Sequence, residues 1–90
     1  MNQLSQLRLE IENLHQELFQ FILKRKDVVE KIWTLKKKSG LDMIDQTREE
    51  NLIGQFDQSQ VFKNDPDLKE FYHQVVKNII VQSKNYAQKP

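Results

Sequence analysis

The sequence predicts an all-α fold of three helices, one long, one short and one of medium length. The 90 residues contain only two glycines and two prolines, so few positions interrupt a helix. Apolar residues recur at helical spacing in three stretches, and no stretch alternates as a strand would. No internal repeat or glycine-rich loop separates these stretches, so we expect one small soluble domain over residues 1–90.

The long helix is predicted from about Ser5 to Lys38. Its apolar residues form a heptad seam at positions 4, 7, 11, 14, 18, 21, 28, 32 and 35. The basic run 36–38 followed by Gly40 is typical of a helix C-terminus. Such a helix spans on the order of 50 Å, whereas a compact domain of this size is only about 30 Å across. We therefore expect a second chain to cover the excess length.

The second helix is predicted to be short, about three turns, and to begin after a cap at Asp42 or Asp45. It carries Leu52, Ile53 and Phe56 on one side and ends in the polar stretch 57–60.

The third helix is predicted to span about twenty residues. Asp65 suits its N-cap, and Pro66 and Asp67 suit its first turn. Its apolar residues recur at helical spacing: Leu68, Tyr72, Val75, Val76, Ile79 and Ile80.

Composition and charge argue against several classes of function. Fourteen Lys and Arg against thirteen Asp and Glu give a net charge of +1, without the basic excess of a nucleic-acid or membrane-surface binder. There is no cysteine, and His15 and His73 lie far apart, so we expect no metal site and no cofactor. The longest aliphatic run, 79–81, is too short to span a membrane, and residues 1–12 do not resemble a signal peptide, so we expect a cytoplasmic protein.

Cations interrupt the apolar seam of the long helix. Position 25 of the seam is arginine, which must snorkel to the surface, pair with a carboxylate or bind an anionic ligand. Lys36 lies eleven residues later, about three turns, and projects from nearly the same face as Arg25. Arg8 flanks the same seam about 25 Å from Arg25, so an antiparallel partner helix would be needed to bring the two together. Considered by itself, Arg8 is interpreted as a solvated surface charge.

Polar residues on the other two helices complete the candidate set. Asp45, Arg48 and Glu49 share one face by their spacing, although most such triplets are only surface salt bridges. Ser83 continues the stripe of Tyr72, Val76 and Ile79 on the core side of the third helix. The simpler interpretation of this serine is a bond back to the carbonyl one turn earlier.

The order and spacing of these residues resemble the all-helical chorismate mutase family along essentially the whole chain. Arg8, Arg25 and Lys36 match the three cations of the family's long helix. The run 45–49, Asp-Gln-Thr-Arg-Glu, matches its Asp-x-x-Arg-Glu signature, and the run 79–83 matches its Ile-Ile-x-x-Ser. The first of these runs, at this distance from the lysine, is the most specific part of the resemblance.

The resemblance implies an intertwined antiparallel helical homodimer with two active sites, each using Arg8 from the other chain. It implies the rearrangement of chorismate, a small dicarboxylate, to prephenate in phenylalanine and tyrosine biosynthesis, without metal or cofactor. Arg25 and the partner's Arg8 would clamp the carboxylates, and Lys36 would face the ether oxygen and one carboxylate.

The resemblance also implies roles for the remaining candidates. Glu49 would accept a hydrogen bond from the ring hydroxyl, and Ser83 would bond the ring carboxylate. Asp45 and Arg48 would order the start of the second helix and the rim of the site.

Two positions depart from the family pattern. His15 stands where the family usually carries an acidic residue. Ala87 stands one turn after Ser83, where the family carries a Gln or Glu expected to hydrogen-bond the ether oxygen. Gln88 is the candidate replacement, but it lies about 100° further around an ideal helix. This departure leaves open a weakened or redirected active site.

Three alternatives remain beside the mutase. An isochorismate-pyruvate lyase uses a similar set of cations on a related substrate, although the complete 45–49 signature favours the mutase. A non-catalytic regulatory or partner-binding dimer could retain the fold. A nucleic-acid-binding bundle using the basic runs 24–26 and 36–38 is disfavoured by the net charge of +1.

Overall fold

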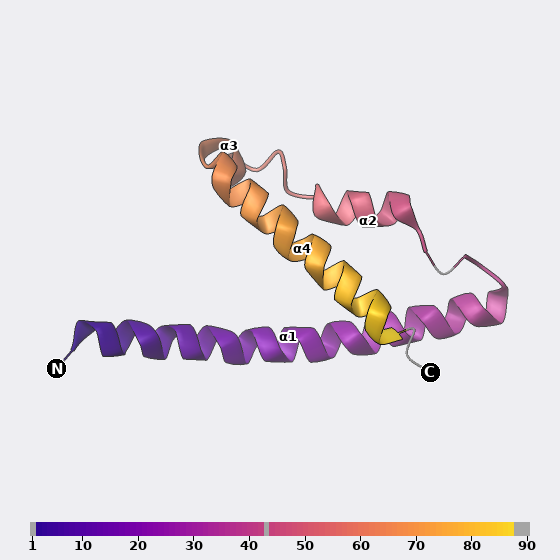
Figure 1. Cartoon of the computed structure of the whole chain (residues 1–90), viewed down its shortest axis with the longest axis horizontal. Helices are drawn as coiled ribbons and strands as arrows, with labels where there is room; N and C mark the ends of the chain where they lie inside the picture. The colour runs from indigo at the N-terminus through magenta and orange to yellow at the C-terminus, as the bar shows by residue number, and fades with distance from the viewer. Residues whose placement is uncertain (1, 43, 88–90) are drawn as a thin grey trace. The chain divides into compact units, whose positions relative to one another are not determined.

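The computed structural model describes residues 2–42 and 44–87, which form four α-helices and contain no strand (Figure 1). The helices are α1 (Gln3–Ser39), α2 (Gln46–Ile53), α3 (Gln60–Asn64) and α4 (Pro66–Ala87). The predicted all-α class is confirmed. The described residues contain one more helix than the three predicted, the single-turn helix α3, which begins at the last residue of the polar stretch 57–60. The chain divides into two compact units, residues 1–32 and 33–90.

The first unit is the N-terminal part of α1, and none of its described residues is buried. The apolar seam residues of this unit, from Leu4 to Ile32, are each exposed by between 44% and 57%. Nothing within the first unit itself covers this row of large apolar side chains. Its burial requires another surface, as the length of the helix already indicated.

The C-terminus of α1 is defined by a glycine. Gly40 adopts a φ of 68°, a left-handed conformation that glycine enters without steric cost. The N–H groups of Gly40 and Leu41 donate to the carbonyls of Lys37 and Lys36, at 3.4 and 3.0 Å. This pair of bonds is the Schellman arrangement, which satisfies the last carbonyls of a helix. The predicted end near Lys38 is therefore confirmed to within one residue.

The helix α2 begins at the second of the two predicted caps. Oδ1 of Asp45 accepts a hydrogen bond from the backbone N–H of Arg48 at 3.0 Å, whereas Asp42 lies outside the helix. The helix ends at Ile53, followed by Gly54, whose N–H donates to the carbonyl of Glu50. Phe56 thus lies in the turn after α2 and not on the helix.

The helices α3 and α4 are each capped by a side chain. Oγ of Ser59 accepts from the N–H of Phe62 at 3.3 Å at the start of α3. Asp65 ends α3 and caps α4, because its Oδ1 accepts from the N–H of Leu68 at 3.0 Å. The predicted N-cap and first-turn proline of the last helix are therefore confirmed.

The core of the second unit forms where α4 packs against both α2 and α3. Phe62 and Ile80 are buried, with 9% and 7% of their surfaces exposed. The ring of Tyr72 contacts Phe62 and Phe56, with centroids 5.4 and 6.0 Å apart, in the tilted and edge-on arrangements that aromatic pairs favour. Within the described residues, no helix is long and apolar enough to cross a membrane.

Candidate active site

The predicted site residues are divided between the two units. Arg8 and Arg25 lie in the first unit, where Arg8 is exposed and Arg25 is half-buried. The second unit contains the remaining described candidates: Lys36, Asp45, Arg48, Glu49 and Ser83. Gln88 lies outside the described residues. The geometry of the site can therefore be built from α2 and α4, which pack against each other in the second unit.

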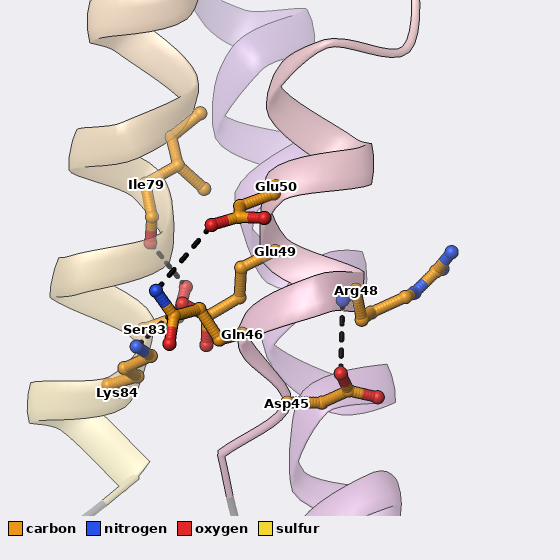
Figure 2. A network of polar contacts seen from close by, with 8 residues as sticks. All are labelled: Asp45, Gln46, Arg48, Glu49, Glu50, Ile79, Ser83 and Lys84. Carbon is orange, nitrogen blue, oxygen red and sulfur yellow. Dashed lines mark hydrogen bonds and ion pairs between the residues drawn. The ribbon is translucent and has the colours of Figure 1, made fainter.

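The carboxylate of Glu49 is held by a lysine on α4. The Nζ of Lys84 lies 2.7 Å from Oε1 of Glu49, and the two side chains are only 27% and 23% exposed (Figure 2). This ion pair joins residues that are 35 positions apart in the sequence. Because the pair is partly buried, its attraction is screened less than that of an exposed helix-surface pair. The contact fixes the direction of the Glu49 side chain toward α4.

Ser83 lies beside this ion pair on α4 (Figure 2). Its Oγ donates a hydrogen bond to the carbonyl of Ile79 at 2.7 Å, one turn earlier in the helix. The simpler interpretation of the serine is therefore confirmed. The side chain is half-buried on the face of α4 that meets α2, so the predicted placement on the core side is also confirmed.

The residues of the Asp-x-x-Arg-Glu run do not act as one surface cluster. Asp45 uses Oδ1 as the N-cap of α2. The side chain of Arg48 is exposed and points away from Glu49, which reaches across to α4 (Figure 2). Asp45 therefore orders the backbone at the start of α2, whereas Glu49 faces the neighbouring helix α4.

Lys84 was not among the residues singled out from the sequence, although a signal for it exists. It lies four residues after the buried Ile80, so it continues the core-facing stripe of α4. A lysine on such a stripe is the same kind of irregularity as Arg25 in the seam of the long helix. The rule that selects Arg25, a cation within an apolar stripe, therefore also selects Lys84 on α4.

The family model for chorismate mutase type II matches residues 7–88, nearly the whole chain and every candidate site residue. The chain belongs to the chorismate mutase type II family. No curated protein and no solved structure matched the chain in the corresponding comparisons. The resemblance read from the motifs is thereby confirmed at the level of the family.

The chemical character of the junction between α2 and α4 follows from its donors and acceptors. Within residues 2–42 and 44–87, no group of three or more His, Asp or Glu side chains could hold a metal ion. Between α2 and α4, the second unit brings together the carboxylate of Glu49, the hydroxyl of Ser83 and the ammonium group of Lys84. Such groups bind and orient a polar substrate through charge and hydrogen bonds.

Position 87, in the last turn of α4, is the alanine that stands where the resemblance predicts a Gln or Glu. Ala87 is the last residue of α4 and is half-buried, four residues after Ser83. Side chains four residues apart lie above one another on a helix, so position 87 belongs to the same face as Ser83. The methyl side chain of an alanine forms no hydrogen bond.

Proposed function

We propose that this chain is a chorismate mutase that converts chorismate to prephenate on the route to phenylalanine and tyrosine. The match of the chorismate mutase type II family to residues 7–88 carries the proposal. The arrangement of α2 and α4 supports it, because Glu49 and Ser83 both face the junction of these helices. Cytoplasmic localisation accompanies the proposal as an expectation.

The proposed reaction suits a site without a nucleophile. The rearrangement of chorismate is unimolecular, so the protein must hold the dicarboxylate in its compact conformer and stabilise charge as the ether bond breaks. Arg25 and the partner's Arg8 would clamp the two carboxylates through bidentate hydrogen bonds. Lys36 would stabilise the negative charge that develops on the ether oxygen.

The residues of α2 and α4 would fix the ring of the substrate. Glu49 would accept a hydrogen bond from the ring hydroxyl. Ser83 would turn its hydroxyl from the carbonyl of Ile79 to the ring carboxylate, since a hydroxyl rotates to suit its acceptor. Asp45 would keep the start of α2 ordered through its capping bond, and Arg48 would form the exposed rim.

The proposal includes a homodimer in which the long helices pair in antiparallel fashion. The uncovered apolar seam of α1 supports this, because large side chains that are about half exposed gain stability when a second copy buries them. A two-fold axis makes the two composite sites equivalent, with Arg8 of each chain serving the other.

The test is the loss of chorismate absorbance with purified protein, followed by identification of the product. We expect prephenate at an enzymatic rate, and a loss of at least about a hundredfold in kcat/KM for Arg25→Ala in a protein that remains folded. Circular dichroism and sedimentation of the variant provide the control. Pyruvate released from isochorismate would identify a lyase instead, and no turnover from a folded dimer would contradict the enzyme.

A further inference from the structure

The ion pair between Glu49 and Lys84 has no role in the proposed clamp of cations on the long helix. It is formed between α2 and α4, and both side chains are about three-quarters withdrawn from solvent. Nothing in the Asp-x-x-Arg-Glu or Ile-Ile-x-x-Ser runs requires a lysine at position 84. The pair is nevertheless the one described ion pair that joins α2 to α4.

We infer that Lys84 is a positioning residue that holds the Glu49 carboxylate in place and neutralises its charge for a dianionic substrate. The inference rests on the proposed function, and it concerns the part of the site that binds the ring hydroxyl. Lys84 acts through Glu49 and does not itself contact the substrate.

Charge provides the first reason. Chorismate carries two carboxylates, and an unpaired Glu49 beside it would repel the substrate in a partly buried site, where such repulsion is strong. The Nζ of Lys84 at 2.7 Å from Oε1 offsets that negative charge. The carboxylate can then lie close to the dianion without a large electrostatic cost.

Geometry provides the second reason. The ion pair uses Oε1 of Glu49, and an ionised carboxylate has two oxygens, each of which accepts hydrogen bonds. Glu49 can therefore accept from Lys84 and from a ring hydroxyl at the same time. A long side chain that is already held in one direction also loses less conformational entropy when the substrate binds.

The test is a double-mutant cycle on kcat/KM with the full-length protein and chorismate, using Lys84→Met, Glu49→Gln and the double variant. Methionine keeps the length and apolar stem of lysine and removes the charge. We expect Lys84→Met to lower kcat/KM about tenfold in the wild-type background and less than about twofold in the Glu49→Gln background. Lys84→Arg, which can still pair with the carboxylate, should restore most of the loss.

Lys77→Met is the matched control. Lys77 is exposed on the same helix, seven residues or about two turns before Lys84, so its replacement removes the same charge from a similar face. We expect its kcat/KM to remain within about twofold of wild type. Equal losses for Lys77→Met and Lys84→Met would show a general effect of charge and overturn the inference.

Other outcomes also decide the question. An unchanged kcat/KM for Lys84→Met overturns the inference, and so does a loss of equal size in the Glu49→Gln background, which would mean direct contact with the substrate. If the wild-type protein does not convert chorismate, the proposed function fails by itself. In that case the affinity of the same variants for chorismate is measured by calorimetry. Coupling between positions 49 and 84 supports the inference. The absence of coupling, or of binding, overturns it.

Discussion

The Nε2 of His73 lies 2.6 Å from Oδ1 of Asp57. This contact joins the middle of α4 to the turn that follows α2. A carboxylate only accepts hydrogen bonds, so the imidazole donates from Nε2 in this contact. The imidazole is 19% exposed and the carboxylate 34%, so the bond is partly shielded from water. It stabilises the second unit about three turns before Lys84 on α4.

We predict that His73→Ala lowers the free energy of unfolding by about 1–2 kcal/mol, because it leaves a half-buried carboxylate without its donor. Urea unfolding followed by circular dichroism measures the change. Gln74→Ala is the control, since Gln74 bonds only an exposed Glu70 on its own helix, and it should cost less than about 0.5 kcal/mol. Equal costs for the two variants would show that the His73 contact contributes nothing beyond helix propensity.

Two substitutions at Asp45 separate its structural role from any contact with the substrate. Asp45→Ala removes the cap of α2 and should cost about 1 kcal/mol of stability, whereas Asp45→Ser keeps a capping oxygen and should cost only a few tenths. If Asp45 acts only by ordering α2, Asp45→Ser also retains the kcat/KM for chorismate within a few-fold. A stable Asp45→Ser protein with a large loss of kcat/KM would instead show that the carboxylate touches the substrate.

The seam of α1 predicts the oligomeric state. Leu14 is 57% exposed in the single chain, and in the proposed dimer it would be covered by the second copy. Leu14→Lys should therefore shift the protein from dimer to monomer in sedimentation experiments, because a buried unpaired ammonium is costly. Gln16→Lys adds the same charge two residues away from this position and off the seam, and it should leave the dimer intact. A dimer that tolerates Leu14→Lys would rule out pairing through this seam.

Sharing of Arg8 between chains is tested by mixing two inactive variants. Arg8→Ala and Arg25→Ala should each abolish nearly all activity as homodimers. When they are mixed and allowed to exchange chains, a heterodimer has one site with both arginines intact and one site with neither. Random exchange should thus restore about one quarter of the wild-type sites. No recovery after demonstrated exchange would mean that Arg8 and Arg25 serve the same chain or different sites.

Local features were the most predictable from the sequence, because they depend on neighbouring residues. The glycine at position 40, the cap at Asp65 and the back-bond of Ser83 each follow from interactions within a few positions of the chain. The single-turn helix α3 was not predicted, since five residues are too few for a periodic pattern. Its stability comes from the Ser59 cap and from burial of Phe62 against α4.

Candidate residues for contacts beyond their own helix can be chosen from the sequence only where the pattern of one helix is visibly broken. Arg25 was found because it interrupts a long seam. Lys84 follows Ile80 by one turn on the core-facing stripe of α4, but the sequence does not show which residue lies opposite it. Its partner Glu49 is 35 positions away, and no local pattern connects the two. The composite arrangement around Arg8 depends on a second chain and stays a prediction.

Ala87 provides the last test of the proposed chemistry. The position is one turn after Ser83 on the half-buried face of α4, so a glutamine there would point toward the same region as the serine. If the ether oxygen lacks a hydrogen-bond donor in this protein, Ala87→Gln should raise kcat about tenfold or more, because such a donor acts mainly in the transition state. Asn85→Gln, on the exposed face of the same helix, is the control and should change nothing. An unchanged rate for Ala87→Gln together with a large loss for Gln88→Ala would show instead that Gln88 already supplies the donor, and that the end of the helix departs from ideal geometry to do so.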